Sequence, residues 1–374
     1  MNPSDDRRHI RFMRVALSLA RRGLGRVAPN PAVGCVLVND GRIVGRGWTC
    51  DGGRPHAETE ALRRAGARAR GATAYVTLEP CAHHGETPPC AQALIDAGIA
   101  KVVVGAGDPD PRVDGGGIRM LVEAGIEVVS GICEAEACEI NAGFLSKVRI
   151  GRPLVTLKVA SSLDGCIATR TGNSQWITGE AARVEGHLLR AAHDAILVGS
   201  GTASEDNPAL TCRLPGLENA SPIRIVVDGR LSVPLTHNLV KTAGEIPVYW
   251  FALTDTVAEY SERATALRDA GVKLFPINPD VSGRVDLAAV LRVLGKEGVT
   301  RLLVEGGATI ASSLLALDLV DRVVWFRAPI VIGGDGLGAI GGFGVDALAD
   351  SAQFSRTSFR RVWNDVIECL ERRR

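Results

Sequence analysis

Short apolar runs alternate with segments of helical periodicity along most of the chain. Apolar runs of four to eight residues bounded by turn residues indicate buried strands, and an apolar residue every three or four positions indicates a helix. The strands expected in the first part span 32–38, 74–78, 101–105 and 126–129, and the helices span 57–65, 117–124 and 134–146, with another beginning at 90. Later strands are expected at 154–159, 195–198, 223–227, 248–253, 272–275, 302–304 and 323–326. This alternation predicts a layered α/β architecture.

The alternation is interrupted near residue 150, where a basic stretch containing a proline, 147–153, follows the last helix of the first part. At 374 residues the chain is long enough for two domains. We therefore expect one α/β domain over 1–147 and a second over 148–374. The hydrophobic content of 46% is ordinary for a globular protein and lets both domains bury a core.

Charge and cysteine content argue against several classes of protein. The chain has 43 basic and 42 acidic residues, so no overall field attracts nucleic acid. It has neither an apolar run of 18 residues nor an N-terminal apolar signal segment, which predicts a cytoplasmic protein that does not bind membranes. Its nine cysteines are an odd number and do not suggest the disulfide framework of a secreted protein.

Candidate chemistry is concentrated in two segments of the first part. His56 and Glu58 stand at the start of an expected helix, Cys81 lies just beyond an expected strand, and Cys90 opens the next helix. One imidazole and two thiolates suit a tetrahedral zinc that keeps its fourth position open for a water with a pKa of about 7. Glu58 is close enough in sequence to carry a proton from such a water to a leaving amine. The pattern predicts a zinc-dependent deaminase.

Three alternatives to this interpretation stay open. In the first, the cysteines are simply buried thiols and Glu58 is a glutamate near a helix start. If Cys90 instead binds a metal, we expect the helix N-terminus to favour its thiolate by lowering its pKa. A structural zinc would need a fourth ligand, such as His83 or His84. The third alternative is a deaminase of bases in nucleic acids. Such enzymes carry two residues between their cysteines, whereas eight residues separate Cys81 from Cys90. The aromatic content of 4% and the near-zero net charge also argue against that class.

Glycine clusters follow two expected strands of the second part. The strand 195–198 runs into Gly199, Ser200 and Gly201, and the strand 302–304 runs into the segment 305–307. Glycines at the carboxyl ends of such strands let backbone N–H groups approach a phosphate, although either cluster alone is more often a turn. A clean G-x-G-x-x-G dinucleotide fingerprint is missing, because in its nearest match Asp110 takes the place of the third glycine.

Taken together, the motifs resemble the bifunctional deaminase/reductase family of bacterial riboflavin biosynthesis over nearly the whole chain. The segments that carry the resemblance are 30–36, 55–58, 80–90 and 108–111 in the first part and 158–165, 174–178, 189–191, 199–213 and 305–307 in the second. The resemblance implies a cytidine deaminase-like α/β/α domain followed by a dihydrofolate reductase-like α/β domain.

Two reactions follow from this resemblance. The first is a zinc-dependent hydrolytic deamination at C2 of 2,5-diamino-6-ribosylamino-4(3H)-pyrimidinone 5′-phosphate. The second is an NADPH-dependent reduction of the ribosyl side chain, which gives 5-amino-6-ribitylamino-uracil 5′-phosphate. The implied cofactors are therefore Zn²⁺ and NADPH, and the implied partner is a phosphorylated pyrimidine. We also expect a homo-oligomer.

The resemblance also assigns roles to individual residues. It implies that zinc is bound by His56, Cys81 and Cys90 and that Glu58 is catalytic. The implied NADPH contacts are Ala160, Trp176, Thr202, Asp206 and the glycine segment from Gly307. The implied substrate contacts are Asn30 in the deaminase half and Ser174, Arg190, Leu210, Arg213 and Glu305 in the reductase half. Two arginines suit a sugar phosphate because a guanidinium binds it with paired hydrogen bonds.

Several of these residues have simpler explanations. Asn30 precedes a proline and is equally explained as a turn residue, and Arg190 as a solvated helix residue. Lys158 and Asp164 either line the reductase site or form a surface ion pair.

One departure from the family pattern concerns the deaminase pocket. Thr49 stands where many members have a histidine, which suggests a lost substrate contact, with Trp48 and Arg54 as candidate replacements. Because three zinc ligands are already supplied, His83 and His84 are expected in the pocket wall or at the substrate phosphate.

Overall fold

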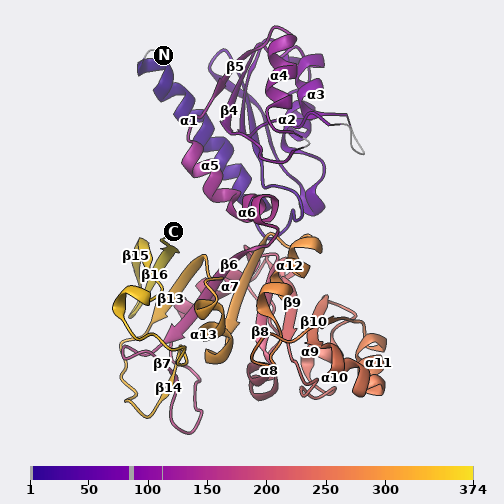
Figure 1. Cartoon of the computed structure of the whole chain (residues 1–374). Coiled ribbons are helices and arrows are strands. Elements are labelled where there is room, and N and C mark those ends of the chain that lie inside the picture. The colour runs from indigo at the N-terminus through magenta and orange to yellow at the C-terminus, as the bar shows by residue number, and fades with distance from the viewer. Residues whose placement is uncertain (1–2, 84–87, 112, 374) are drawn as a thin grey trace. The chain divides into compact units, whose positions relative to one another are not determined.

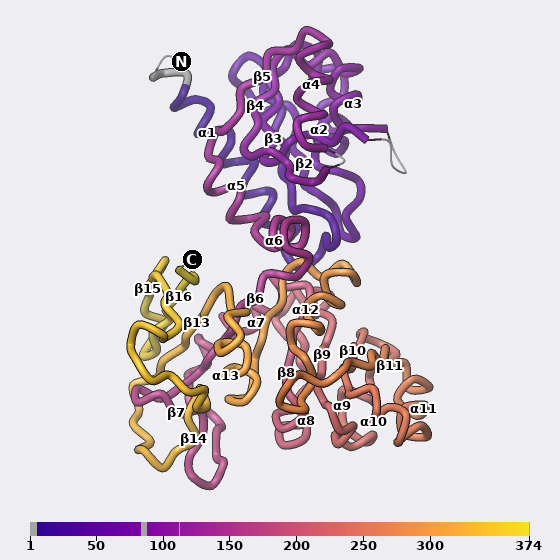
Figure 2. The backbone as a smooth tube through the Cα atoms, in the orientation of Figure 1, coloured from indigo at the N-terminus to yellow at the C-terminus, as the bar shows by residue number. Residues whose placement is uncertain are grey.

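The computed structural model describes residues 3–83, 88–111 and 113–373. The chain divides into two compact units, Met1–Gly151 and Arg152–Arg374 (Figures 1 and 2). The predicted boundary after residue 147 falls inside a helix, α6 (Ala142–Ile150), and Gly151 caps the end of this helix. Gly151 has a φ of 71°, and a glycine in this left-handed conformation commonly ends a helix.

Five strands among the described residues of the first unit form one sheet, in the order β2-β1-β3-β4-β5. The strands are β1 (Gly34–Asn39), β2 (Arg42–Trp48), β3 (Thr73–Leu78), β4 (Lys101–Ala106) and β5 (Glu127–Ser130). Strand β1 is antiparallel to β2 and β3, whereas β3, β4 and β5 are parallel. The prediction missed β2, because this edge strand is partly exposed and its polar residues interrupt the apolar run.

Helices pack on both faces of this sheet. Their bounds are α1 (Pro3–Ala20), α2 (Ala57–Ala65), α3 (Cys90–Asp96), α4 (Gly116–Glu123), α5 (Glu134–Ile140) and α6. Helix α2 lies directly on β2, and Gly47 makes this possible because a Cβ there would be 2.0 Å from the carbonyl oxygen of Ala57. The close contact places the start of α2, with His56 and Glu58, against the sheet.

The helix expected over 134–146 is in fact two helices, α5 and α6, separated at Asn141. Asn141 is buried, and its Oδ1 accepts a hydrogen bond from the N–H of Ala32 at 2.9 Å. Its Nδ2 donates to the carbonyl oxygen of Ala137 at 3.4 Å. A side chain that bonds to the backbone in this way competes with helix continuation, and apolar periodicity does not detect it.

Nine strands in the described part of the second unit form a sheet in the order β11-β10-β9-β8-β12-β6-β13-β16-β15. They are β6 (Leu154–Ser161), β8 (Ala195–Gly199), β9 (Ile223–Val227), β10 (Val248–Leu253), β11 (Val272–Ile277), β12 (Arg301–Gly306), β13 (Arg322–Arg327), β15 (Phe354–Val362) and β16 (Asp365–Arg372). The first seven strands in this order are parallel and are those predicted, whereas β16 and β15 continue the sheet antiparallel. Strands β7 (Cys166–Ala168) and β14 (Leu337–Gly338) pair separately.

Both faces of the parallel part of this larger sheet are buried. Neighbouring residues of β8, Leu197 and Val198, belong to two different apolar clusters, as expected for a parallel strand covered by helices on both sides. The helices are α7 (Glu180–Ala191), α8 (Ser200–Asp206), α9 (Asn238–Lys241), α10 (Thr254–Glu259), α11 (Ser261–Asp269), α12 (Leu287–Lys296) and α13 (Ala308–Ala316). Short 3₁₀ turns occur at Arg21–Gly23, Asp51–Gly53, Gly66–Ala69, Glu218–Ala220 and Leu348–Asp350.

Two further expectations concern the whole chain. Among the residues that the structure describes, no helix combines the length and the apolar character needed to span a membrane. All nine cysteines lie in the described ranges, and each is a free thiol, so the predicted absence of a disulfide framework holds for them.

Candidate active sites

The three predicted zinc ligands come together where α2, α3 and the end of β3 meet. His56 is the residue before α2, Cys81 follows β3, and Cys90 begins α3. Nδ1 of His56 lies 3.3 Å from Sγ of Cys90 and 3.8 Å from Sγ of Cys81, and all three ligand atoms lie within 4.8 Å of one another. Tetrahedral zinc with normal bond lengths would separate nitrogen and sulfur ligands by roughly 3.5 Å. The donor set and its spacing therefore fit zinc.

This group has three ligands and no fourth among the residues that the structure describes. His83 lines the adjoining cavity, and its Nδ1 is buried without a hydrogen-bond partner in the described structure. His84, the other candidate for a fourth ligand, lies outside the described residues. A tetrahedral zinc with three protein ligands keeps its fourth position open, which is typical of a catalytic zinc and not of a structural one.

The two cysteine thiols have very different pKa values. Hydrogen bonds from Cys90 and His56 outweigh burial and lower the pKa of Cys81 to about 4. The pKa of Cys90 is raised, first by its hydrogen bond to Cys81 and then by burial. The expectation that the helix N-terminus lowers the pKa of Cys90 is therefore wrong, because the hydrogen bond to Cys81 and burial are stronger. A divalent cation would take the place of the thiol proton, which is why metal binding releases thiol protons.

Glu58 lies in the same cavity as these ligands. The cavity has a volume of about 340 Å³ and also exposes His56, Cys81 and Asn30. The Glu58 side chain is only 3% exposed, and this burial raises its pKa to about 7 even though the nearby His56 lowers it. A carboxyl group with such a pKa can both accept and release a proton near neutral pH.

Asn30 and Thr49 shape the wall of this cavity. Asn30 lines it and donates a hydrogen bond from Nδ2 to the carbonyl oxygen of Gly53 at 3.2 Å. The hydroxyl of Thr49 donates to the carbonyl oxygen of Pro31 at 3.1 Å and accepts from the N–H of Val33 at 3.0 Å. Thr49 therefore holds the segment that follows Asn30.

Of the two candidate replacements for the missing histidine, only Arg54 is among the residues that line the cavity. Trp48 lies instead between two guanidinium groups, those of Arg22 and Arg64, at 4.9 and 4.8 Å from its ring. Such cation–π contacts stabilise the outer surface of β2.

Sequence reasoning assigned no role to three acidic residues at this site. Asp108 and Asp110 are buried and line the cavity, and Glu79 is buried beside them. Glu79 accepts hydrogen bonds from the N–H groups of Gly117 at 3.0 Å and Ile118 at 3.2 Å, and so holds the start of α4. The sequence did contain a signal for the two aspartates, because the Asp-Pro-Asp-Pro segment follows β4. Strand β4 is parallel to β3, which ends before Cys81, so both segments lie at the same edge of the sheet.

In the second unit, a buried ion-pair network joins β12, α7 and β6. Nε and Nη2 of Arg190 donate to the two carboxylate oxygens of Glu305 at 2.7 and 2.8 Å, and Nζ of Lys158 lies 3.9 Å from Oε2 of Glu305. Burial raises the pKa of Glu305, but Lys158 and Arg190 outweigh it and lower the pKa to about 2. Arg190 is thus a buried partner of Glu305, not a solvated residue. Asp164 instead accepts hydrogen bonds from Ser162 and nearby backbone in an exposed turn.

The structure brings some other predicted reductase residues together and leaves others apart. The hydroxyl of Thr202 accepts a hydrogen bond from the N–H of Gly307 at 3.1 Å, which joins the two glycine clusters. Nη1 of Arg190 donates to the carbonyl oxygen of Thr211, two residues before Arg213. The remaining positions are Ala160 on β6, Ser174 and the exposed Trp176 before α7, the exposed Asp206 at the end of α8, and the buried Leu210.

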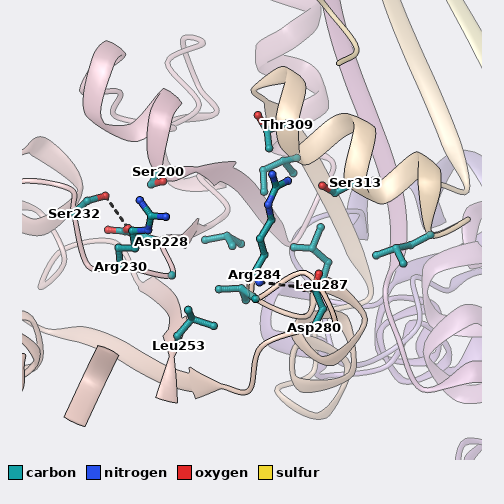
Figure 3. A pocket seen from close by; sticks show the side chains of 16 residues that line it. Ser200, Asp228, Arg230, Ser232, Leu253, Asp280, Arg284, Leu287, Thr309 and Ser313 are labelled. Atoms are coloured by element: carbon teal, nitrogen blue, oxygen red, sulfur yellow. Dashed lines mark hydrogen bonds between the residues drawn. The ribbon is translucent and has the colours of Figure 1, made fainter. Parts of the chain in front are cut away.

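A second cavity, of about 370 Å³, lies at the carboxyl ends of β8, β9 and β10 and is closed by α13 (Figure 3). None of the individually predicted NADPH or substrate contacts lines it, but Ser200 of the first glycine cluster does. Its polar lining also includes Arg230, Ser232 and Arg284. The sequence offered no motif for these three residues, because only the order of the strands brings them together.

Comparisons with known proteins support a deaminase site in the first unit and a reductase site in the second. Residues 6–106 match the model of the cytidine and deoxycytidylate deaminase zinc-binding region, and residues 153–367 match that of the RibD C-terminal domain. The class of protein is thus a zinc-binding deaminase joined to a reductase domain, with the predicted cytidine deaminase-like and dihydrofolate reductase-like α/β folds.

The relatives extend the match to the whole chain. It is 44% identical to the riboflavin biosynthesis protein RibD of Escherichia coli (strain K12), covering 96% of this chain and 97% of that protein. It is 43% identical to RibD of Bacillus amyloliquefaciens, covering 95% and 94%. The structure of Acinetobacter baumannii RibD matches with a TM-score of 0.88 and 38% identity over 99% of this chain and all of that one. The chain belongs to the RibD family, and the predicted enzyme of riboflavin biosynthesis is confirmed.

A Thermotoga maritima structure has a similar match, with a TM-score of 0.85 and 35% identity over 99% of this chain and 100% of that chain. That protein is described as a diaminohydroxyphosphoribosylaminopyrimidine deaminase/5-amino-6-(5-phosphoribosylamino)uracil reductase.

Proposed function

We propose that the chain hydrolytically deaminates 2,5-diamino-6-ribosylamino-4(3H)-pyrimidinone 5′-phosphate and then reduces the ribosyl side chain of the product with NADPH. The observation that carries the first step is the group of His56, Cys81 and Cys90 beside the buried Glu58 in one cavity. The observation that carries the second is the network around Glu305 at the end of a parallel strand. The activities named for the Thermotoga maritima relative support both steps.

In the deaminase site, His56, Cys81 and Cys90 hold zinc. When bound, Zn²⁺ activates a water molecule as the nucleophile. Glu58 accepts a proton from the water and returns it to the leaving amine, so that water is consumed and ammonia is released. The cavity excludes bulk water from Glu58, which is 3% exposed.

Three further groups of this cavity contact the substrate. Asn30 presents its amide to the pyrimidine, in line with its place in the cavity wall. The buried Nδ1 of His83 has no hydrogen-bond partner among the described residues, and a polar substrate group would supply one. Asp108 lines the same cavity, where its carboxylate can accept a hydrogen bond from the substrate as well as the one it accepts from the N–H of Asp110.

In the reductase site, NADPH supplies the hydride when bound, and the product gains this hydride and a proton. Glu305 and Arg190 hold the sugar chain of the substrate, and Lys158 places an ammonium group beside them. The substrate contacts Ser174, Leu210 and Arg213, and NADPH contacts Ala160, Trp176, Thr202, Asp206 and Gly307. The hydrogen bond between Thr202 and Gly307 holds the two glycine clusters together beside the start of α13. The small side chains there leave room for a phosphate.

Product analysis with the pure protein tests the two steps separately. We expect ammonia from the diaminopyrimidinone phosphate without NADPH, and NADPH oxidation only when deaminated product is present. Glu58→Gln should lower ammonia release by 10²-fold or more, since general acid–base catalysis contributes this much, yet reduce supplied deaminated product normally.

Glu60→Gln is the matched control, because Glu60 lies on the same helix and binds Arg63 and Arg64 away from the cavity. Ammonia release that survives Glu58→Gln would refute the role of Glu58. NADPH oxidation that never follows deamination would refute the reductase step. A cytoplasmic location and a homo-oligomeric assembly stay predictions from the sequence.

A further inference from the structure

Glu79 links two segments of the wall of the deaminase cavity. It follows β3 directly and comes before residues 80–82, the Cys81 segment, which contains one residue of the predicted zinc-binding group. Its N–H donates to the carbonyl oxygen of Ala106, the last residue of β4, at 2.9 Å. Glu79 is only 5% exposed and lines the cavity together with Asp108. A carboxylate in such a buried position needs hydrogen-bond donors in place of water.

Four backbone N–H groups supply these donors. Oε1 of Glu79 accepts from the N–H of Gly117 at 3.0 Å and from that of Ile118 at 3.2 Å, both in the first turn of α4. Oε2 accepts from the N–H of Gly115 at 3.2 Å and from that of Asp108 at 3.5 Å. One oxygen therefore binds the start of α4, and the other also reaches the loop between β4 and α4.

Helix α4 depends on this carboxylate, because its N-cap residue is Gly115, which has no side chain. At most helix starts, an oxygen of the N-cap side chain accepts a hydrogen bond from the second or third N–H group of the helix. Glu79 binds these two N–H groups of α4 from the end of a strand. A negative charge is also favourable at this end of a helix dipole. Removal of the carboxylate would therefore loosen the start of α4.

Close packing fixes the same helix start against the Cys81 segment. A Cβ atom at Gly117 would lie 1.8 Å from the carbonyl oxygen of Pro80, so only glycine fits there. A Cβ atom at Gly116 would lie 3.0 Å from Cβ of Ala82. This packing gives the carboxylate of Glu79 a defined position relative to Cys81, from which it holds the neighbouring loop.

The loop that Glu79 holds carries Asp108 and Asp110, which both line the cavity. Oδ1 of Asp108 accepts a hydrogen bond from the N–H of Asp110 at 2.9 Å, and the carbonyl oxygen of Asp110 accepts from the N–H of Val113 at 2.7 Å. These bonds shape the turn, but they do not attach it to the rest of the cavity wall. The hydrogen bond from the N–H of Asp108 to Glu79 attaches it to the strand that leads to Cys81.

We infer that Glu79 is a positioning residue of the deaminase, whose carboxylate sets the place of Asp108 relative to the zinc-binding group. The inference rests on the proposed deamination, in which Asp108 contacts the substrate, and deepens it by naming the residue that holds this contact. Because both oxygens of Glu79 are occupied by backbone donors, Glu79 acts through Asp108 and not on the substrate directly.

A double-mutant cycle tests this role in the full chain loaded with zinc. Ammonia release from the diaminopyrimidinone phosphate would give kcat and KM. Glu79→Gln keeps the shape of the side chain but has one acceptor oxygen, so it can serve only one of the two pairs of N–H groups. We expect its KM to rise by about threefold or more, with kcat changed by less than about twofold.

The second variant of the cycle, Asp108→Ala, removes the proposed contact itself and should raise KM by about tenfold or more. In the Asp108→Ala background, Glu79→Gln should change KM by less than about twofold, because the side chain that Glu79 positions is absent. A residue that only stabilised the fold would change KM by the same factor in both backgrounds.

Glu123→Gln is the matched control, since Glu123 is exposed at the other end of α4 and is not among the described residues that line the cavity. Glu79→Asp keeps the charge but is one carbon shorter, so it should also raise KM, and it serves in the cycle if Glu79→Gln does not fold. Zinc content, thermal unfolding and reduction of supplied product show that each variant is folded.

An unchanged KM in Glu79→Gln or in Asp108→Ala, or an equal rise caused by Glu79→Gln in both backgrounds, would overturn the inference and leave deamination intact. A large loss of kcat in Glu79→Gln with KM unchanged would overturn it as well, because Glu79 would then act on the chemical step. A wild-type protein that releases no ammonia would overturn both the inference and the deaminase function.

Discussion

Arg190 and Glu305 form a two-pronged ion pair with N···O distances of 2.7 and 2.8 Å, although 115 residues separate them in the chain. Their side chains are 16% and 9% exposed. Removal of one partner from a buried pair costs about 3–5 kcal/mol when the other charge is left uncompensated, and here Lys158 still faces Glu305 when Arg190 is removed. The pair therefore connects α7 to β12 and also presents a carboxylate of low pKa in the reductase site.

Glu305→Ala should destabilise the second unit by about that amount, Arg190→Ala should destabilise it less, and the double variant should be less destabilised than the sum of the two. Urea unfolding followed by circular dichroism would measure this coupling. Arg190→Lys is the control, because it keeps the positive charge but loses the two paired hydrogen bonds to Glu305. Strictly additive losses would show that Arg190 and Glu305 do not stabilise each other.

The parallel strands of the second unit could be predicted from the sequence, because strands buried on both faces are continuous apolar runs. The edge strands β2 and β15 could not, since polar and charged residues interrupt their apolar pattern. The group of His56, Cys81 and Cys90 could be predicted from its motif, in which Cys81 and Cys90 are close in sequence. Arg230 and Arg284 could not, because the order of the strands alone brings them to one cavity.

His193 should make the stability of the second unit depend on pH. It is buried, its Nε2 lies 3.1 Å from the hydroxyl of Thr156, and burial together with the charge of Arg301 lowers its pKa from 6.5 to about 4. In this range the unfolded chain binds more protons than the folded chain, so stability is present above pH 6.5 and is lost as the pH falls toward 4. The contribution is about 3 kcal/mol at most.

Urea unfolding between pH 7 and pH 4 would measure this dependence. The variant His193→Gln should be less stable at pH 7 but should lose less stability on acidification than the wild type. The comparison of slopes isolates His193 from the carboxylates, because the variant and the wild type have the same carboxylates, Glu305 included. Parallel slopes in the two proteins would contradict a buried neutral imidazole.

Thr49 should act on the deaminase by holding the loop that carries Asn30. Thr49→Val keeps the shape but removes the hydroxyl that bonds to Pro31 and Val33, and it leaves the N–H of Val33 without that partner. We expect a destabilisation of about 1–3 kcal/mol and a higher KM for deamination, with reduction of supplied product unchanged. Thr49→Ser keeps the hydroxyl and should behave like the wild type in both assays. If Val and Ser substitutions give the same KM, the hydroxyl does not position the loop.

Zinc content should depend on Cys81 and Cys90 but not on other thiols nearby. Cys81→Ser and Cys90→Ser each remove one of three ligands, so the metal retained after dialysis should fall by tenfold or more from about one zinc per chain. Because metal binding stabilises the folded state, the unfolding temperature of the first unit should fall as well.

Cys50→Ser is the matched control for these two variants, since Cys50 is a half-buried free thiol of the same unit that does not belong to the ligand group. Inductively coupled plasma mass spectrometry and thermal unfolding would measure metal and stability on the same samples. Glu58→Gln should retain its zinc, because Glu58 is not one of the three ligands. Loss of zinc in Cys50→Ser, or full zinc in Cys90→Ser, would place the metal elsewhere than among His56, Cys81 and Cys90.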